Sequence, residues 1–232
     1  MKKHACILFC YNNVDHIIKC VDSLHLPDID YYVIENKSVN STAIEAYFKT
    51  KNIKRYIQFE TNISNSALRV FFNDYTNELL HYDYITVTDC DLYLTDARST
   101  FEELKKNLDF LNVGMSCVDL SMENYPYKIA QGQNWIPEPT IITDDYLVCP
   151  TGGHLMTLKQ NNAHIFYNQD PFIDGGLLQS TINAGLIWVK TKINKALHLT
   201  WDLYVEGNEY YEYKKLPNIW NHGNYCNYKQ II

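Results

Sequence analysis

Short apolar runs alternate with segments of helical spacing through the first 90 residues of the chain. The runs ACILFCY, YYVIEN, RYIQFE and YDYITVTD are rich in β-branched and aromatic residues, and each is about as long as a strand. Between them, apolar residues from Val14 to Leu24 form one helical stripe, and NSTAIEAYFKTKN begins like a helix capped by Ser41 or Thr42. This alternation predicts an α/β fold, with a Rossmann-like, mostly parallel central sheet covered by helices on both faces.

The second half of the sequence is less regular. Residues 96–109 have the pattern of a surface helix, and NVGMSCVDLS has that of a strand. A long proline-containing loop is predicted from Tyr125 to Asp144, a helix from about Gly175 to Ala184 and a strand from Leu186 to Val189. We expect a small antiparallel part here. No linker or change in composition divides the 232 residues, so one domain is predicted over residues 1–232.

Charge and cysteine content restrict the class of protein. The formal net charge is −7 without any block of Lys and Arg, which argues against a nucleic-acid partner. The seven cysteines are an odd number, are scattered and form no C-x-x-C pair, which favours reduced, buried thiols. No apolar run approaches the ~20 residues that cross a bilayer, and the N-terminus becomes polar too soon for a secretory signal. We therefore expect a cytoplasmic protein without a transmembrane segment; peripheral contact with a membrane and the oligomeric state stay open.

Polar side chains follow each of the four predicted strands. In parallel sheets, ligands bind beyond the carboxyl ends of the strands, which meet at one edge. Asn and Asp are also common in turns and helix caps, so one such residue alone would mean little. Four strand ends together predict a polar crevice. The residues are Asn12, Asn13, Glu35, Asn36, Asn62, Asp89 and Asp91.

Two of these residues, Asp89 and Asp91, are carboxylates separated by one residue at the end of the fourth strand. Both can reach the crevice only if the chain turns there or if both lie on one face of the strand. Mg²⁺ and Mn²⁺ prefer carboxylate oxygen and keep positions for water and phosphate. The pair therefore predicts a cation site that would neutralise a diphosphate leaving group.

Four segments, ILFCYNN, YYVIENKSVNS, TNISNSALR and YITVTDCDLYL, follow one another in the first half. Their order and spacing resemble nucleotide-sugar glycosyltransferases of the GT-A fold, in particular the large family 2. The first is similar to the base-binding turn of that family, and the second to its strand with an acidic residue and Asn, here Glu35 and Asn36. The third is similar to its Asn-led loop and helix, marking Asn62 and Arg69. The fourth lies where the family carries its metal-binding acidic pair.

The resemblance extends, with fewer matches, into the second half. CPTGGHLMTLK looks like a segment that lines the acceptor side, where His154 has either an acceptor contact or a packing role. The catalytic Asp of the family precedes an Ala-Gly pair, and here Asp174 lies eleven residues before Gly185. Asp170 is the alternative base. His198 stands where the family often has a His, which implies a third metal ligand, and His222 is the alternative.

This sequence departs from the family pattern at three places. Ile173 stands where the family usually has Glu before the catalytic Asp, Ser180 lies where an Arg is often found, and Ser64 replaces a Gly. These departures affect the assignment of the base more than that of the nucleotide site. For Asp174, the plain alternative is a helix N-cap.

The resemblance implies a nucleotide-sugar-binding half, residues 1–95, and an acceptor-binding and catalytic-base half, residues 96–232. It implies transfer of a sugar from a nucleoside diphosphate sugar, with UDP favoured, to a glycan or other hydroxyl acceptor, as in polysaccharide biosynthesis. The transfer would depend on Mn²⁺ or Mg²⁺ and would invert the anomeric centre, with Asp174 as the base. The implied donor-binding residues are Asn12, Glu35, Asn36, Asn62, Arg69 and Asp89; the implied metal ligands are Asp89, Asp91 and His198.

Two other classes of function compete with this one. A sugar nucleotidyltransferase would need a Gly-rich, Lys- or Arg-bearing loop after the first strand, and CYNNVDH lacks it. A non-catalytic nucleotide-sugar-binding module would bind nucleotide without turnover and would be indifferent to Asp174→Asn. The intact acidic pair favours an enzyme.

Overall fold

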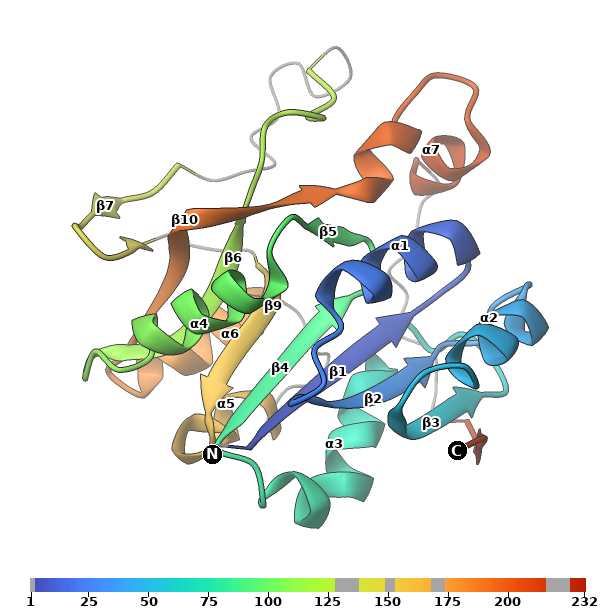
Figure 1. Ribbon diagram of the computed structural model, residues 1–232, viewed down its shortest axis with the longest axis horizontal. Coiled ribbons are helices and arrows are strands. Elements are labelled where there is room, and N and C mark those ends of the chain that lie inside the picture. Colours follow the sequence, from blue (N-terminus) through green and yellow to red (C-terminus); the bar gives the residue numbers. More distant parts are fainter. Residues whose placement is uncertain (1–2, 128–137, 149–152, 168–173, 216–225) are drawn as a thin grey trace.

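The computed structural model describes residues 3–127, 138–148, 153–167, 174–215 and 226–232 (Figure 1). Its strands are β1 (His4–Cys10), β2 (Asp30–Glu35), β3 (Ile53–Phe59), β4 (Tyr84–Asp89), β5 (Leu92–Leu94), β6 (Val113–Leu120), β7 (Ile141–Ile142), β8 (Leu147–Val148), β9 (His154–Lys159), β10 (Ile187–His198) and β11 (Tyr228–Gln230). Its α-helices are α1 (Val14–Leu24), α2 (Ser41–Phe48), α3 (Ser66–Leu79), α4 (Ala97–Asn107), α5 (His164–Tyr167), α6 (Asp174–Asn183) and α7 (Glu209–Lys214), and its 3₁₀ helices are η1 (Gln160–Asn162) and η2 (Leu199–Leu203).

The strands of the described segments belong to one sheet with the order β11-β3-β2-β1-β4-β9-β6-β10-β8-β7, and β5 pairs with β10. β3, β2, β1 and β4 are parallel. β9 is antiparallel to both β4 and β6, whereas β6 and β10 are parallel. The predicted mostly parallel sheet with a smaller antiparallel part is therefore confirmed.

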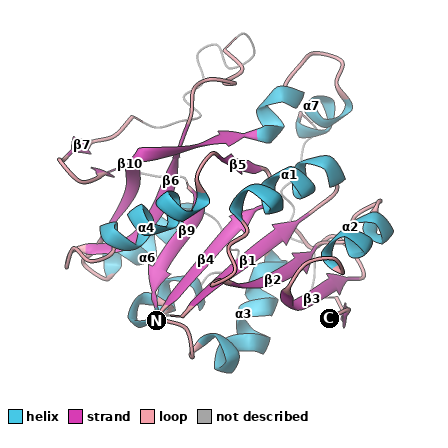
Figure 2. Ribbon diagram, in the orientation of Figure 1, coloured by secondary structure: helices cyan, strands magenta, loops and turns pink. Residues whose placement is uncertain are grey.

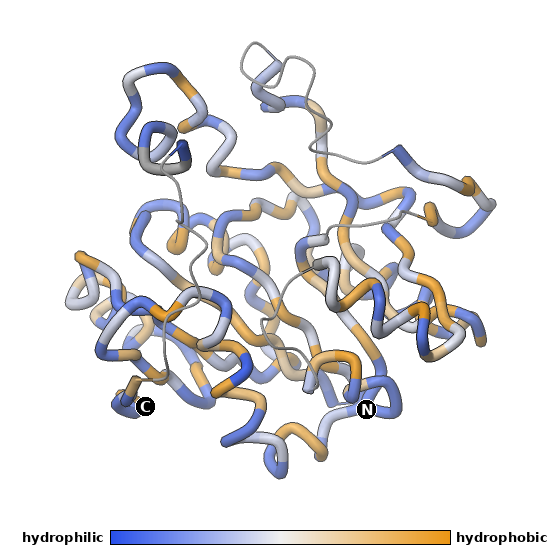
Figure 3. Tube along the Cα trace, turned by 180° about the vertical axis from the view of Figure 1, so that it is seen from behind, coloured by the Kyte–Doolittle hydropathy of each residue, from blue (hydrophilic) through white to orange (hydrophobic). Residues whose placement is uncertain are grey.

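Helices cover both faces of the sheet (Figure 2), so its central strands are buried on both sides. In β1, Ala5 and Ile7 belong to the core under α3, α5 and α6. The alternate residues Cys6 and Leu8 belong to the core under α1, α2 and α4. The side-chain period of two explains why these strands appear in the sequence as continuous apolar runs. The edge strand β7 differs: Ile141 and Ile142 stay 57% and 67% exposed and form an apolar stretch of the trace in Figure 3.

The predicted cap of α2 is wrong. Asn40 precedes the helix without a side-chain cap, and Ser41 is the first helical residue. The Ser41 hydroxyl is close to the carbonyl oxygen of Ser38, at 2.7 Å, and also hydrogen bonds to the carboxylate of Glu35. The side chain is drawn away from the helix end because a buried carboxylate is the stronger acceptor.

β10 is much longer than the predicted strand over residues 186–189. It continues through an irregularity between Lys190 and Lys195. The Glu103 carboxylate accepts the backbone N–H groups of Lys192, Ile193 and Asn194 at 2.7–2.9 Å. This long-range contact gives the backbone N–H groups of the irregular segment a hydrogen-bond acceptor, although the segment carries no strand pattern of its own. The strand can then continue toward His198.

The six cysteines within the described ranges are free, and five of them are buried, as predicted; Cys226 is half-buried and Cys149 lies outside the described residues. Among the described helices, none combines the length and apolar character that a membrane crossing requires. The predicted loop from Tyr125 to Asp144 lies largely outside the described residues.

Buried His4 makes the stability of the fold depend on pH. Its side chain is 3% exposed, with Nε2 2.7 Å from Thr86 Oγ1. Burial, helped by the charge of Lys105, lowers the pKa of His4 from 6.5 to about 3. The unfolded chain therefore binds a proton that the folded chain does not, and the free energy of unfolding falls as the pH drops below about 6.5, by up to about 1.4 kcal/mol per pH unit.

We expect urea denaturation between about pH 7 and pH 4.5 to show this loss for the native protein and a shallower slope for His4→Phe. Thr86 keeps a hydroxyl partner in that variant, because Thr157 Oγ1 is 2.7 Å away. A residual slope will come from His16 and His25, whose pKa values are also lowered by burial. Equal slopes for the two proteins would contradict the assignment.

Candidate active site

A cavity of about 400 Å³ opens beyond the carboxyl ends of β1, β2, β3 and β4. Residues that follow different strands meet there, as expected for a parallel sheet. The sequence predicted that these residues lie at one edge of the sheet. That they bind a sugar nucleotide or a cation stays a prediction. The predicted residues that line the cavity are Asn12, Asn13, Asn36, Asn62, Asp89 and Asp91.

The turn after β1 is a left-handed bend that is fastened to the neighbouring loop. Asn12 and Asn13 have φ values of 51° and 41°, a region that Asn tolerates better than most residues. The Asn12 N–H donates to Ser38 Oγ at 2.8 Å, and Asn12 Oδ1 accepts from the Val39 N–H at 2.8 Å. The loops after β1 and β2 are thus held in fixed positions at the rim.

The loops after β2 and β3 are joined by two amide side chains. Asn36 Nδ2 donates to Asn62 Oδ1 at 2.6 Å, and Asn36 Oδ1 accepts from the Ile63 N–H at 2.9 Å. Asn62 Oδ1 also accepts from the N–H of Ser64 at 2.8 Å. Ser64 has a φ of 52°, so this chain keeps the left-handed conformation at the position where the resemblance implies a Gly.

Glu35 lies below this rim and does not line the cavity. Its side chain is fully buried, with Gln58 Nε2 at 2.7 Å and the Ser38 N–H at 3.2 Å. The hydroxyls of Ser41 and Tyr56 also hydrogen bond to it. The predicted contact with a nucleotide stays a prediction, and the structure adds a second role: Glu35 organises the loop that holds Asn12.

Other predicted residues lie elsewhere. Arg69 is half-buried on α3 and is not among the residues that line the cavity. Asp174 is the first residue of α6, and its side chain is outside the described part of the structure. Asp170, Ile173 and His222 also lie outside the described residues.

The acidic pair reaches the cavity because the chain turns between its members. Asp89 ends β4, and Asp91 stands just before β5. Between them, the N–H of Cys90 donates to the carbonyl oxygen of Phe9 at 3.2 Å, and Cys90 Sγ lies 3.1 Å from Cys10 Sγ in the core. Buried sulfur therefore anchors the turn from below.

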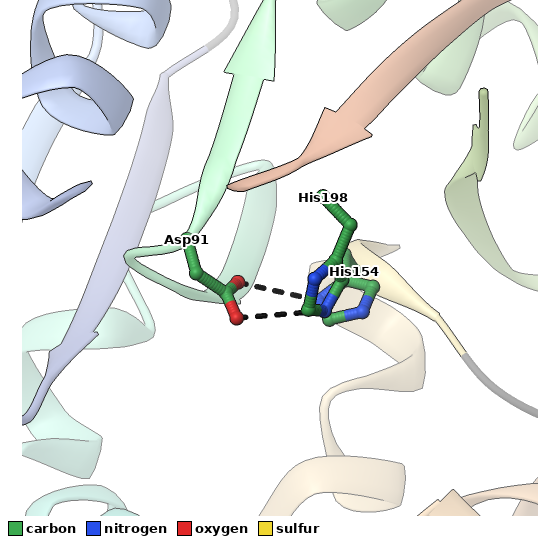
Figure 4. A group of neighbouring side chains, drawn as sticks. All are labelled: Asp91, His154 and His198. Carbon is green, nitrogen blue, oxygen red and sulfur yellow. Dashed lines mark ion pairs between the residues drawn. The ribbon is translucent and has the colours of Figure 1, made fainter. Parts of the chain in front are cut away.

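Asp91 meets two histidines (Figure 4). Its Oδ2 is 3.4 Å from His198 Nε2, and its Oδ1 is 3.9 Å from His154 Nδ1. The three residues offer ligand atoms within 4.8 Å of one another, an arrangement that could hold a metal ion. The structure thus brings together Asp91 and His198 of the predicted metal ligands, places Asp89 at the cavity outside this cluster and adds His154.

Thr200 and Trp201 support the His198 ring. Thr200 Oγ1 is 2.8 Å from His198 Nδ1 and 3.3 Å from Asp91 Oδ2. The His198 and Trp201 rings stack with centroids 5.0 Å apart at 19°. Trp201 is only 6% exposed, so it packs beneath the site.

The cavity is acidic. Besides the Asp pair, Glu209 of α7 lines it, whereas no Lys or Arg is found among its described lining residues. Tyr210 of the same helix also lines it. Burial, with added repulsion from Tyr204 and Asp91, raises the pKa of the Tyr210 phenol, so it is a neutral O–H donor at the rim.

Sequence reasoning did not select Tyr11, Thr200 or Glu209 as cavity residues, and it left His154 open between two roles. Tyr11 adjoins the predicted turn and could have been found from its place after β1. The others come from segments far along the chain, and no local pattern indicates which strand ends they approach.

No family model matches the chain. Three proteins of Acanthamoeba polyphaga mimivirus, all described as uncharacterized, are 31%, 28% and 30% identical to it over 94% of its length. The chain covers 32%, 48% and 26% of these proteins respectively, less than half the length of each.

Among solved structures, the mannosyltransferase PcManGT from Pyrobaculum calidifontis, in complex with GDP-Man and Mn²⁺, is similar over 92% of this chain and 60% of its own, with a TM-score of 0.63 at 12% identity. TarS from S. aureus matches with a TM-score of 0.53 at 14% identity, over 85% of this chain and 60% of its own. A protein of Desulfovibrio desulfuricans described as a putative nucleotide-diphospho-sugar transferase matches with a TM-score of 0.53 at 9% identity, over 94% of this chain and 92% of its own.

These likenesses define the class of fold. The chain has a GT-A-like fold, the fold of nucleotide-sugar glycosyltransferases, as the sequence motifs predicted.

Proposed function

We propose that this chain is a cation-dependent glycosyltransferase that moves a sugar from a nucleoside diphosphate sugar, with a UDP-sugar favoured, to a glycan-type hydroxyl acceptor. One observation carries the proposal: Asp91 lines the cavity at the strand ends together with amide groups, and it also belongs to a three-residue cluster suited to a cation, on a GT-A-like fold. The mannosyltransferase with this fold that binds GDP-Man and Mn²⁺ supports it.

The carboxylate and imidazole ligand atoms would suit a divalent cation held by Asp91 and His198, with His154 beside them. Asp89 would contact the ribose, or the cation through water. When bound, the cation supplies the positive charge that the acidic cavity lacks, and so stabilises the departing diphosphate. Arg69 would add a fixed positive charge only if it reaches the phosphates from α3.

The base and ribose of the donor would lie against the amide-rich rim formed by Asn12, Asn36 and Asn62. Tyr11, 37% exposed at the cavity, offers an aromatic face beside this rim. Because the rim loops are hydrogen bonded to one another, they would be arranged before the donor arrives. This reduces the ordering cost of binding.

Asp174 would act as the base for inverting transfer. It would take the proton of the acceptor hydroxyl as that oxygen bonds to the anomeric carbon, while the bond from that carbon to the diphosphate breaks on the opposite face. Its place as the first residue of α6 suits a carboxylate, because helix N-termini stabilise negative charge. Capping and proton transfer are compatible roles.

Cation-dependent hydrolysis of a panel of UDP-, GDP- and dTDP-sugars tests the proposal, because slow donor hydrolysis needs no known acceptor. We expect release of nucleoside diphosphate from one donor in the presence of Mn²⁺ and none after chelation. Asp174→Asn should bind the same donor and lose turnover to the acceptor, once one is identified.

Donor binding without turnover of any donor or acceptor, together with indifference to Asp174→Asn, would favour a non-catalytic nucleotide-sugar-binding module instead. Formation of a sugar nucleotide from nucleoside triphosphate and sugar phosphate would favour a nucleotidyltransferase. The cytoplasmic location expected from the sequence stays a prediction.

A further inference from the structure

We propose that the cation is bound by two imidazoles and one carboxylate, from His154, His198 and Asp91, and that the site therefore selects a transition-metal dication over Mg²⁺ and Ca²⁺. The inference deepens the proposed function and rests on it only for the use of the cation in glycosyl transfer. Cation binding itself can be measured without any sugar nucleotide.

Three separate strands deliver these ligands to one place. Asp91 follows β4, His198 ends β10 and His154 begins β9 (Figure 4). The backbone carbonyl oxygen of Asp91 accepts from the Leu199 N–H at 2.7 Å, which ties the turn after β4 to the end of β10. The pairing of β10 with β5 places His198 opposite Leu92, one residue after Asp91. The convergence is therefore set by backbone hydrogen bonds.

The separations suit a shared ion. Two ligands whose bonds to one ion are about 2.1 Å long lie about 3.0 Å apart at 90°, about 3.4 Å apart at a tetrahedral angle and at most about 4.2 Å apart. The two distances start from different oxygens of the Asp91 carboxylate: Oδ2 is 3.4 Å from His198 Nε2 and Oδ1 is 3.9 Å from His154 Nδ1, and both distances fall inside this range. The two histidine rings are 4.8 Å apart, centroid to centroid, and nearly perpendicular at 76°.

The surroundings of His198 fix which nitrogen faces the site. A carboxylate only accepts hydrogen bonds, so the Thr200 hydroxyl donates to Asp91 Oδ2 and accepts from His198 Nδ1–H. In the neutral ring, Nε2, the nitrogen near Asp91, is then the one that carries the lone pair. Metal-binding histidines are typically oriented by such a hydrogen bond from the other ring nitrogen.

The start of β9 is shaped so that His154 points to the same place. The next residue, Leu155, is buried yet has a φ of 55°, which is unusual and costly for a non-glycine residue. The β6–β9 register shifts by one residue at this point, a bulge of the kind that redirects a side chain. Gly153 is needed before it, since a Cβ there would lie 2.7 Å from Cys117 Sγ and 2.9 Å from Trp188.

The chemistry of the three ligand side chains decides which cations bind tightly. Imidazole nitrogen suits Fe²⁺, Co²⁺, Ni²⁺ and Zn²⁺, whereas Mg²⁺ and Ca²⁺ take oxygen ligands almost exclusively. Affinity at nitrogen- and oxygen-containing sites also rises from Mn²⁺ to Co²⁺. A site with two imidazoles should therefore bind Co²⁺ more tightly than Mn²⁺, and Mn²⁺ more tightly than Mg²⁺.

Calorimetric titration of the full chain with Co²⁺, Mn²⁺ and Mg²⁺, without nucleotide, tests the inference. We expect Co²⁺ to bind at least about tenfold more tightly than Mg²⁺. His154→Ala should weaken Co²⁺ by at least about tenfold, the lower limit seen even for loss of an outer-shell partner. It should also change the Co²⁺ d–d absorption spectrum. His81→Ala, an exposed histidine away from the cavity, is the control and should match the native protein.

His154→Asp separates a ligand from a packing residue. It replaces imidazole with a carboxylate, so we expect it to retain a cation while the ratio of Mg²⁺ to Co²⁺ affinity rises. A packing role would give the same loss for His154→Ala and His154→Asp, with no change in preference. The Co²⁺ spectrum of the native protein adds a readout that does not depend on either variant folding.

The inference is overturned if the native protein binds Mg²⁺ as tightly as Co²⁺, or if folded His154→Ala keeps the native Co²⁺ affinity and spectrum. These outcomes differ from failure of the proposed function. Histidine-dependent Co²⁺ binding without turnover of any donor would leave the cation site standing and remove the transferase. If Mg²⁺ supported donor turnover as well as Co²⁺ did, and His154→Ala left turnover unchanged, the transferase would stand and the proposed cation site would be wrong.

Discussion

Asp91→Asn should reduce cation-dependent hydrolysis of the donor by more than about a hundredfold, a larger loss than removal of an outer-shell partner would cause. Asp91 is the residue on which the cluster converges, since His154, His198 and Thr200 all approach its carboxylate. The amide keeps the size of the side chain but removes the negative charge. We therefore expect both cation affinity and donor hydrolysis to fall together.

Steady-state release of nucleoside diphosphate at several Mn²⁺ concentrations measures this effect. Asp89→Asn is the variant to compare. Asp89 lines the cavity outside the cluster, so loss of its charge should lower the affinity for the sugar nucleotide more than the affinity for the cation. Asp109→Asn removes an exposed acid that pairs with Lys159 at the surface and should leave hydrolysis unchanged. If Asp89→Asn lost the cation and Asp91→Asn kept it, the cluster would not be the cation site.

Glu35→Gln should lower the free energy of unfolding by about 2–4 kcal/mol. The Glu35 carboxylate is fully buried and accepts hydrogen bonds on both oxygens, from Ser38 and Ser41 on one and from Tyr56 and Gln58 on the other. An amide can supply only one oxygen, so its NH₂ group must face donors. Those buried donors then lose their acceptor, which costs more than the net value of the bonds.

Urea denaturation monitored by fluorescence gives this free energy, and Glu60→Gln, at an exposed residue after β3, is the matched control with an expected change within about 0.5 kcal/mol. Nucleotide affinity of the folded variant separates the two roles of Glu35. If stability were unchanged and only nucleotide binding fell, direct contact with the donor would be the main role, and the structural role would be wrong.

Much of the nucleotide half could be predicted because its signals are local. β1, β2 and β4 are mostly apolar or β-branched runs, and Asn, Glu or Asp stands at or soon after the end of each strand from β1 to β4. Parallel pairing then brings these turns to one edge without further information. Even the departure at Ser64 is conservative, because the left-handed backbone that a Gly would favour is retained there.

Long-range contacts explain the predictions that failed. The helix start at Ser41 was misplaced because buried Glu35 takes its hydroxyl. The length of β10 depends on Glu103, which is about 90 residues away along the chain and satisfies the irregular segment between Lys190 and Lys195. Neither effect leaves a mark in a short window of sequence.

The sequence by itself determined the α/β class, the parallel half of the sheet and the polar residues at its carboxyl edge, because hydrophobic periodicity and turn chemistry act between neighbours. Only the tertiary structure decided which side chains meet at the cation cluster. His154 joins Asp91 because of a one-residue register shift and a left-handed Leu155 at the start of β9. A shift of one residue turns every following side chain to the other face of a strand, and only pairing with distant strands sets it.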